Sequence, residues 1–306
     1  MGRILVTGGS GIVGRHAVNA LASQGHDLHL ISRHPVQNPD HETHQADILD
    51  IPAMEQLLKA VRPESILHLA WETEHGEYWH SPNNLNHVAA SLHLAKQFRE
   101  LGGGRFVAAG TCAEYSWAEK DLSAPLDEKT ALCHPHTLYG QSKLSTFRLL
   151  GKYAETSGLS FAWGRLFLLY GPGEQARRLC PDVILNLTNN QPVKCSSGKQ
   201  IRDFMHTEDA GRAFAALLDS DVQGPVNMAT GSALPLSGFV QELAEQLGRP
   251  DLVKLGALPD RPDDPKQLIA KTDRLKHEVG YHPVHTLESG LRDTIAWWRA
   301  NRSEKN

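Results

Sequence analysis

The chain has 306 residues, of which 40% are hydrophobic and 22% charged, and its formal net charge is -4 at pH 7. This length can bury a large core, and the composition is that of an ordinary globular protein. The slightly acidic balance gives no reason to expect nucleic acid, and no apolar run is long enough to span a membrane. We expect a cytoplasmic protein without a signal peptide, because the first predicted strand begins at once.

The first predicted element is a buried parallel strand, Arg3–Thr7, made of branched apolar residues. It leads into a glycine-rich turn, and a helical pattern follows through Leu21. Glycines permit a tight turn, and backbone N–H groups at a helix N-terminus can hold a pyrophosphate. Strand, turn and helix in this order predict a dinucleotide site. Its expected contacts are Gly8, Ser10, Gly11, Ile12, Val13 and Gly14.

The second predicted strand, Asp27–Ile31, ends at Ser32 and Arg33. In dinucleotide-binding folds this position meets the adenosine ribose, with an acid for NAD and a cation for NADP. Arg33 can form a forked pair with a 2'-phosphate, so the sequence favours NADP. The alternative is that Arg33 is only a loop cation and that NAD is also accepted.

Regular alternation continues with a helix over Ile51–Val61 and a strand over Ser65–Ala70. The turn-rich stretch from Trp71 to Pro82 comes next. A helix is then predicted over Asn86–Leu101, where apolar residues recur at helical spacing, and Gly102–Gly104 ends it.

Three side chains suited to proton chemistry follow. The strand that starts at Arg105 delivers the hydroxyl of Thr111 at its carboxyl end, where open α/β sheets bind ligands. Tyr139 and Lys143 stand four residues apart at the start of a predicted helix, so their side chains share one face. The ammonium would lower the pKa of the phenol and prepare it as an acid or base. A solvated helix face would show the same spacing.

The last part of the chain contains another strand that ends near Arg165, and beyond Gly173 the alternation of strands and helices breaks down. Further elements are expected as helices over Thr207–Leu218, Phe239–Leu247 and Leu287–Arg299 and as a strand over Pro225–Met228.

Cysteine and histidine spacing predicts no metal site. The four cysteines show neither a CxxC pair nor zinc spacing, so reduced thiols are expected. The 17 histidines form no i, i+4 helical pair.

Together these stretches resemble the extended short-chain dehydrogenase/reductase family, the branch that modifies nucleotide-linked sugars with NAD(P). The resemblance covers nearly the whole chain. Besides the glycine turn, Thr111, Tyr139 and Lys143, it includes Arg165–Pro172 and Arg202–Phe204. It implies an α/β fold, a doubly wound parallel Rossmann sheet with a smaller C-terminal α/β substrate-binding domain. The Rossmann domain would cover 1–166 and about 206–230, and the substrate-binding domain 167–205 and 231–306.

The resemblance also assigns roles around the cofactor. Asp47 and Ile48 would meet the adenine, although burial alone would explain Ile48 equally well. The strand that starts at Ser65 ends at Leu69 and Ala70, and in relatives this strand end passes beside the cofactor.

The same resemblance gives the reacting groups their roles. Tyr139 would exchange a proton with a sugar oxygen while hydride passes between carbon and cofactor. Thr111 would hold that oxygen, and Lys143 would bind the nicotinamide ribose.

On the substrate side, the resemblance implies that Thr73, Cys112, Ala113 and Leu168 contact the substrate, and Thr73 belongs to a segment that lines the cleft in the family. Arg202 is the first candidate for the substrate pyrophosphate and Arg178 the second. The alternative for Arg202 is a structural pair with Asp203 or Asp209.

Departures from the family pattern restrict the reaction. Cys112 and Ala113 follow Thr111, where the similar sugar 4,6-dehydratases carry Asp and Glu. A methyl group cannot move a proton, so dehydration is not expected. We expect Cys112 to be a small packing residue; the alternative is a weak acid or base, as a thiol is in some epimerase-reductases of the family, where the Cys stands one place further on. Leu168 replaces an Asn that contacts substrate in many relatives, which weakens any transfer of substrate specificity.

Two enzyme activities and one other function remain. An NADP-dependent 4-ketoreductase acting on a nucleotide-linked 4-keto-6-deoxyhexose is favoured, and a 4-epimerase with tightly held NAD is the alternative. A dinucleotide sensor is the remote third possibility. Sensors of this descent commonly lose the Tyr or Lys, whereas this chain retains Tyr139, Lys143 and Thr111. The resemblance further implies a homodimer formed through a four-helix bundle.

Overall fold

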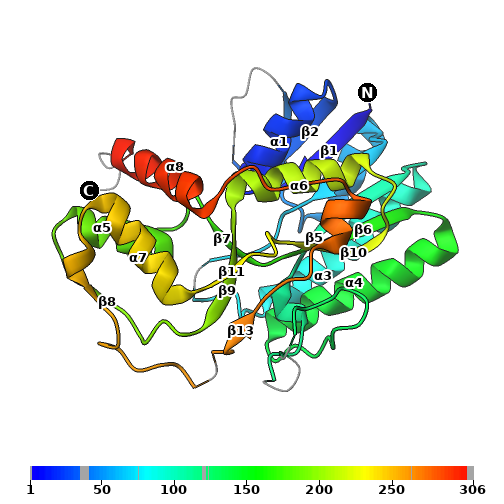
Figure 1. The fold of residues 1–306 in the computed structure, drawn as a ribbon. Coiled ribbons are helices and arrows are strands. Elements are labelled where there is room, and N and C mark those ends of the chain that lie inside the picture. The colour runs from blue at the N-terminus through cyan, green and yellow to red at the C-terminus, as the bar shows by residue number, and fades with distance from the viewer. Residues whose placement is uncertain are drawn as a thin grey trace.

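The structure is a computed structural model that describes residues 2–34, 41–74, 76–118, 122, 124–262 and 264–301. Its larger part is built on a seven-stranded parallel sheet (Figure 1). The spatial order is β10-β6-β5-β4-β1-β2-β3, so the chain begins in the middle, runs to one edge and then returns past β1. The strands are β1 (Arg3–Thr7), β2 (Asp27–Ser32), β3 (Glu42–Gln45), β4 (Ser65–His68), β5 (Arg105–Thr111), β6 (Ser160–Leu166) and β10 (Gly224–Met228).

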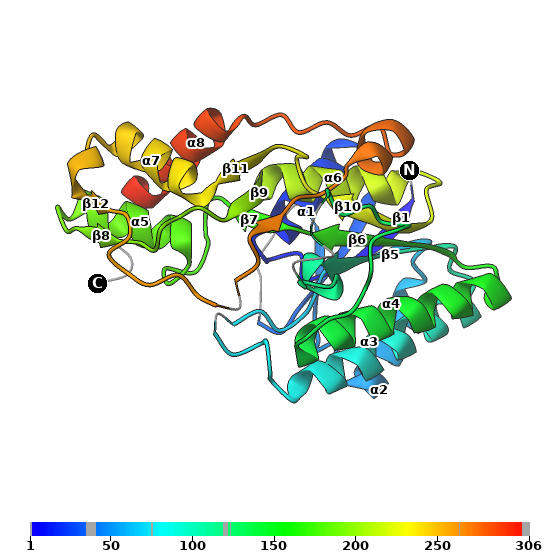
Figure 2. The same ribbon diagram turned by 60° about the horizontal axis from the view of Figure 1, so that its bottom comes forward.

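Helices cover both faces of this sheet, which confirms the doubly wound prediction. One face carries α1 (Gly14–Ser23) and α6 (Thr207–Asp219), whose apolar residues share a core with β1 and β2. The other face carries α2 (Ile51–Val61), α3 (Asn83–Glu100) and α4 (Leu138–Ser157), which lie together in Figure 2. The order of strands reverses between β1 and β4, so ligands are expected at the carboxyl ends of these two strands.

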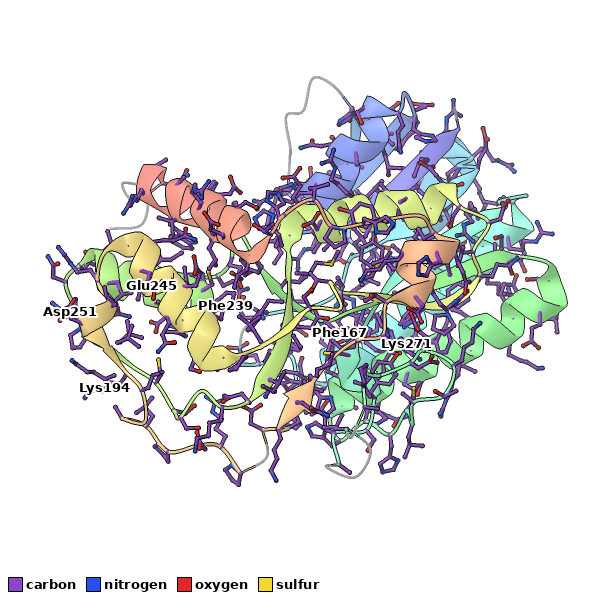
Figure 3. All side chains as sticks on the ribbon, in the orientation of Figure 1. Phe167, Lys194, Phe239, Glu245, Asp251 and Lys271 are labelled. Atoms are coloured by element: carbon purple, nitrogen blue, oxygen red, sulfur yellow. The ribbon has the colours of Figure 1, made fainter. Side chains whose placement is uncertain are left out.

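The smaller part holds a second sheet, in which β9 is the central strand (Figure 1, left). Phe239 is fully buried in its core, and Phe167 lies nearer the large sheet (Figure 3). The strands of this sheet are β7 (Leu168–Tyr170), β9 (Ile201–His206), β11 (Ala233–Pro235) and β13 (Gln267–Leu268). A two-stranded sheet joins β8 (Val193–Lys194) to β12 (Val253–Lys254). The helices are α5 (Leu179–Thr188), α7 (Leu236–Leu247) and α8 (Leu287–Ala300).

Short helical turns complete the described fold. They are η1 (Cys112–Glu114), η3 (Pro250–Leu252) and the π-type turn η4 (Arg274–Glu278). Two predicted helices begin earlier than expected, α3 at Asn83 rather than Asn86 and α7 at Leu236 rather than Phe239. Each follows a proline, which is compatible with a helix start, and each first turn contains residues of low helix propensity. Within the described residues, none of the helices has the length and apolar character that crossing a bilayer requires.

A buried histidine ties the two central strands to α3. The His68 ring lies 2.8 Å from the Thr7 hydroxyl through Nδ1 and 2.9 Å from the Ser91 hydroxyl through Nε2. Because Ser91 donates its own proton to the His87 carbonyl, it accepts from Nε2–H, and Nδ1 accepts from Thr7. Burial lowers the pKa of His68 to about 3, so the ring is neutral when it makes these bonds.

Candidate active site

A single large cleft runs along the carboxyl edge of the seven-stranded sheet and continues into the smaller part. Its volume is about 2560 Å³. A drug-sized ligand occupies a pocket of roughly 300–1,000 Å³, so this cleft has room for two extended ligands side by side. It is lined by the turn after β1, the ends of β2 and β5, and residues of β9 and α7.

The glycine turn fits a dinucleotide pyrophosphate. Gly8 has φ of 73°, and a Cβ on it would lie 2.8 Å from the Ala70 nitrogen. A Cβ on Gly14 would lie 2.0 Å from the Gly8 carbonyl oxygen, so only glycine allows α1 to start this close to β1. The Gly11 N–H donates to that same carbonyl at 3.0 Å. All six predicted contacts of this turn line the cleft: Gly8, Ser10, Gly11, Ile12, Val13 and Gly14.

The predicted adenosine contacts line the same cleft. Ser32 and Arg33 stand at the end of β2, and Arg33 is exposed. In the described part of β2 and the two residues after it, no carboxylate follows Ile31. Asp47 and Ile48 line the cleft after β3, where the Asp47 carboxylate accepts from the Leu49 N–H at 3.0 Å. Leu69 and Ala70 line it after β4.

Thr111 and Tyr139 both line the cleft, whereas Lys143 is buried and does not line it. Thr111 ends β5 and caps η1, accepting from the Ala113 N–H at 3.2 Å. Thr137 caps α4, so Tyr139 stands in the first turn of that helix. Both residues line the cleft, and the Thr111 side chain is close enough to the Tyr139 phenol to oppose the rise of its pKa.

Lys143 uses its ammonium on other partners. Its Nζ donates to the Ala109 carbonyl at 2.8 Å and lies 3.7 Å from the ring centroid of Trp71. Lys143 is 3% exposed and does not line the cleft, because the Trp71 ring covers it. Burial lowers the pKa of Lys143 to about 7, and the Glu114 carboxylate opposes that shift.

The expected lowering of the Tyr139 pKa is wrong for this site. Burial raises the pKa of Tyr139 above its ordinary value, and the Tyr78 phenol adds to the rise, while the Thr111 side chain opposes it. The cause is the desolvation of the ring, which outweighs the effect of any nearby cation. Tyr139 is therefore a protonated phenol at neutral pH.

An aromatic wall around Tyr139 is the feature that sequence reasoning missed. Ring centroids of Trp71, Tyr78 and Trp79 lie 6.5, 4.8 and 5.7 Å from that of Tyr139, each edge to face. All three rings come from the turn-rich stretch between Trp71 and Pro82, whose composition is compatible with ligand stacking and with loop packing alike. The structure packs them against Tyr139, and such edge-to-face contacts fix ring orientations.

Behind the cleft, Glu114 is a fully buried carboxylate that holds Thr111. It accepts from the Thr111 N–H at 2.9 Å, the Trp163 indole at 2.8 Å and Arg165 Nε at 2.7 Å. Arg165 is 1% exposed, so the ion pair is shielded from water. Sequence reasoning noted Arg165 only as part of the family resemblance and missed Glu114, because the pair joins η1 to β6 across 51 residues.

The substrate-side cations also lie in the cleft. Arg202 and Arg178 both line it. Arg202 pairs with Asp264, so neither expected partner is correct. Asp203 instead accepts from Thr230 and the Gly231 N–H, and Asp209 accepts from the Tyr281 hydroxyl and two backbone N–H groups.

The other predicted substrate contacts differ in how they face the cleft. Thr73 lines it, and its carbonyl accepts from Arg178 at 3.4 Å. Cys112 and Leu168 also line it, whereas Ala113 is buried behind it. Burial raises the pKa of Cys112 to about 12, so its thiol stays protonated at neutral pH.

The doubly wound sheet and the cleft are those of the extended short-chain dehydrogenase/reductase class, as the sequence predicted. Residues 4–229 match the model of the NAD dependent epimerase/dehydratase family, and the chain belongs to that family. UDP-glucose 4-epimerase of Corynebacterium glutamicum is 28% identical, with 97% of this chain and 96% of the relative covered.

Solved structures share the fold over the full length. UDP-glucose 4-epimerase of Thermotoga maritima, solved with UDP-glucose, has a TM-score of 0.87 at 24% identity and covers 98% of this chain and 99% of that one. UDP-glucose 4-epimerase of Thermus thermophilus, solved with NAD, has a TM-score of 0.83 at 22% identity and covers 97% and 99%.

The Glu114–Arg165 pair gives a stability prediction. Replacing Arg165 by Met leaves a buried carboxylate without its counter-ion, which should lower the free energy of unfolding by about 3–5 kcal/mol. Urea unfolding measures this change. The matched control is Lys96→Met, which breaks an exposed i, i+4 pair with Glu100 at 3.1 Å and should cost less than about 1 kcal/mol. Equal losses in the two variants would show that burial of the pair adds nothing.

Proposed function

We propose that the enzyme transfers hydride at C4 of the sugar of a nucleoside diphosphate sugar, with a nicotinamide dinucleotide as its partner. The observation that carries this proposal is the meeting of the Thr111 hydroxyl and the Tyr139 phenol beside the glycine turn, in one cleft that also holds Arg202. The substrates in the relatives' names, UDP-glucose among them, support the substrate class.

The residues divide the chemistry between them. A bound nicotinamide supplies or accepts the hydride. Tyr139 carries a proton on its phenol oxygen and exchanges it with the oxygen at C4, and the Thr111 hydroxyl holds that oxygen by a hydrogen bond. Arg202 and Arg178 offer guanidinium groups to the substrate pyrophosphate. Lys143 fixes the strand end next to Thr111 through the Ala109 carbonyl.

Within this class a 4-ketoreductase is our first candidate. Reduction of a ketone requires a proton donor, and the raised pKa of Tyr139 keeps the phenol protonated at neutral pH. Dehydration would require an acid and a base beside Thr111, whereas Ala113 has no titratable group and Cys112 keeps its proton. A nucleotide-linked 4-keto-6-deoxyhexose is the substrate we infer.

The cofactor follows from two observations that favour different forms. Arg33 at the end of β2 supports NADP, because a guanidinium can pair with the 2'-phosphate. The NAD bound to the Thermus thermophilus epimerase supports NAD. We therefore propose that the cleft accepts a nicotinamide dinucleotide of either form, and NAD should be assayed beside NADP.

A 4-epimerase is the second candidate. The match to the Corynebacterium glutamicum UDP-glucose 4-epimerase over 97% of this chain favours it. An epimerase oxidises and re-reduces the same carbon, so it consumes no cofactor and has to hold NAD through both steps.

By the family resemblance we also propose a homodimer formed through α3 and α4, which lie side by side (Figure 2). Leu85 on α3 and Leu149 on α4 are 58% and 53% exposed, and a second copy would cover such apolar side chains. The measurement is light scattering at micromolar concentration, where a mass of two chains is expected. A mass of one chain, 33.7 kDa, would contradict the dimer.

The two candidate reactions separate in a direct assay. A 4-ketoreductase should consume NADPH or NADH stoichiometrically when given a nucleotide-linked 4-keto-6-deoxyhexose, followed by the absorbance of the reduced nicotinamide. The epimerase would instead be purified with stoichiometric NAD. It would interconvert UDP-glucose and UDP-galactose without net oxidation of a cofactor.

Replacing Tyr139 by Phe tests the proton donor itself. Loss of the phenol should lower kcat by about 10²–10⁴-fold, the usual contribution of a positioned acid, and leave dinucleotide affinity nearly unchanged. Steady-state kinetics and a cofactor titration give the two values. Tyr153→Phe is the matched control, because Tyr153 is on the same helix but outside the cleft residues. Unchanged turnover in Tyr139→Phe would remove Tyr139 from the mechanism.

A further inference from the structure

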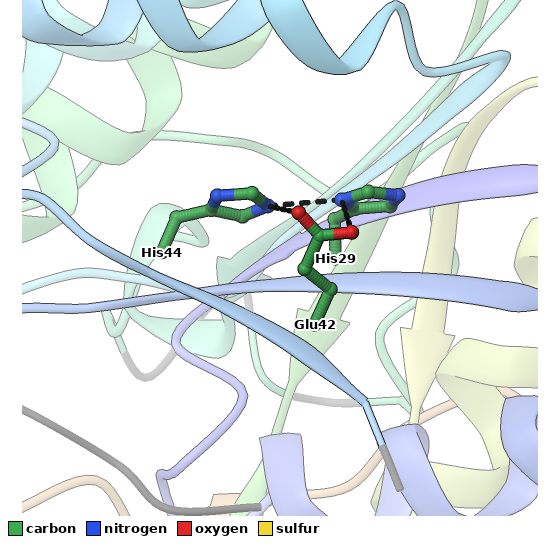
Figure 4. Close-up of side chains that lie close together, drawn as sticks. All are labelled: His29, Glu42 and His44. Atoms are coloured by element: carbon green, nitrogen blue, oxygen red, sulfur yellow. Dashed lines mark hydrogen bonds and ion pairs between the residues drawn. The ribbon is translucent and has the colours of Figure 1, made fainter. Parts of the chain in front are cut away.

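Two histidines and a glutamate gather on one face of β2 and β3, outside the cleft (Figure 4). His29 is on β2, and Glu42 and His44 are on the neighbouring edge strand β3. The register pairs His29 with Glu42 and Ile31 with His44. Because side chains two residues apart on a strand point to the same face, the pairing brings all three together.

Each of the three side chains offers one ligand atom, and these atoms form a triangle in which all lie within 4.8 Å of one another. His29 Nδ1 lies 2.9 Å from His44 Nε2. One Glu42 carboxylate oxygen lies 3.6 Å from His29 Nδ1, and the other lies 3.8 Å from His44 Nε2. Two ligand atoms bound to one tetrahedral zinc at about 2.0 Å stand roughly 3.3 Å apart. The distance between the two nitrogens, and the distance from each nitrogen to its own Glu42 oxygen, are within about 0.5 Å of that separation.

The His29 ring also has a carboxylate beside its second nitrogen, which we call its outer partner. The Asp27 carboxylate lies 3.6 Å from His29 Nε2, on the side of the ring away from the triangle. Asp27 is itself held by Arg3 Nε at 2.8 Å. A metal-bound histidine almost always gives its second N–H to a carboxylate or carbonyl, which fixes the tautomer that leaves Nδ1 free to bind.

Burial and access suit a metal ion as well. The His29 side chain is only 8% exposed, whereas Glu42 is 64% exposed, so the triangle has a rigid base and an open side. Without a metal, the two imidazoles share one hydrogen bond between Nδ1 and Nε2. A metal would replace that bond, with the His44 proton on its outer nitrogen.

We propose that His29, Glu42 and His44 bind a divalent transition metal of the zinc type, with water in the fourth position. Two imidazoles and one carboxylate select Zn²⁺ and its neighbours over Mg²⁺ or Ca²⁺, which take oxygen ligands. The metal joins the edge strand β3 to β2. It therefore stabilises the edge of the sheet whose two strand ends carry Arg33 and Asp47 into the cleft.

Histidine spacing along the chain did not predict this site, because the ligands are joined by strand register rather than by a helical turn. A second triangle, His206, Glu208 and His285, exists at the start of α6. There the Arg15 guanidinium acts on His206, and its positive charge repels a metal ion. We therefore assign the metal to the first triangle and use the second as a control.

The test uses untagged full-length protein stripped with a chelator and titrated calorimetrically with ZnCl2. One Zn²⁺ per chain should bind, and the unfolding temperature should rise with zinc because the metal binds only the folded chain. His44→Gln and Glu42→Gln should each weaken binding at least tenfold and reduce that rise. Asp27→Asn, which removes the carboxylate beside His29 together with its ion pair to Arg3, should weaken binding about 10–100-fold.

The control variants decide which site binds. His93→Gln removes a histidine that pairs with Glu55 at 2.8 Å but belongs to no three-ligand group among the residues that the structure describes, and it should bind zinc like the parent chain. His285→Gln should also leave binding unchanged. Co²⁺ in place of Zn²⁺ should give the visible absorption of a tetrahedral site, and His44→Gln should abolish it.

Two outcomes would overturn the assignment. One is zinc binding that His44→Gln and Glu42→Gln leave intact, and the other is binding that His285→Gln removes. Both triangle residues tested are on the edge strand and partly exposed, so these variants do not depend on replacing the buried His29.

Discussion

The active-site edge of the sheet depends on one fully buried carboxylate. Glu114 sits one turn beyond the end of β5 and accepts hydrogen bonds from the Thr111 backbone, the Trp163 indole and Arg165. A buried charge is tolerated only when it is paired and hydrogen-bonded, and these three donors satisfy that condition. They come from β5 and β6, so one side chain fixes both the position of Thr111 and the pairing of the strands on which it stands.

Much of the fold could be predicted because its signals are local. The branched run before Gly8, the glycine turn and the alternation of strands and helices each follow from neighbouring residues, and the structure has the strands and helices they predict. The starts of α3 and α7 were misplaced because their first turns contain residues of low helix propensity, Asn83 and Asn84 in α3 and Ser237 and Gly238 in α7. The smaller part could be described only loosely, because β9 pairs with strands that come from three separate segments.

The candidate site was predictable in its composition but not in its electrostatics. Spacing placed Tyr139 and Lys143 on one helix face, which α4 confirms. It could not show that Trp71 covers the ammonium or that three aromatic rings surround the phenol. Those rings come from a loop far earlier in the chain, and their effect is to remove water, which raises the pKa of Tyr139 and lowers that of Lys143. The partner of Arg202 was missed for the same reason, since Asp264 lies 62 residues away in sequence.

The position of Lys143 gives it a structural part in the site. Tyr139 and Lys143 share a helix face, but Tyr139 is in the first turn of α4 and Lys143 is one turn further along the helix. From there Nζ reaches the Ala109 carbonyl, two residues before Thr111 on β5. This hydrogen bond ties the first turns of α4 to the end of β5. The distance between the two hydroxyls in the cleft is thus set from two sides, by Glu114 on the Thr111 backbone and by Lys143 on the helix that carries Tyr139.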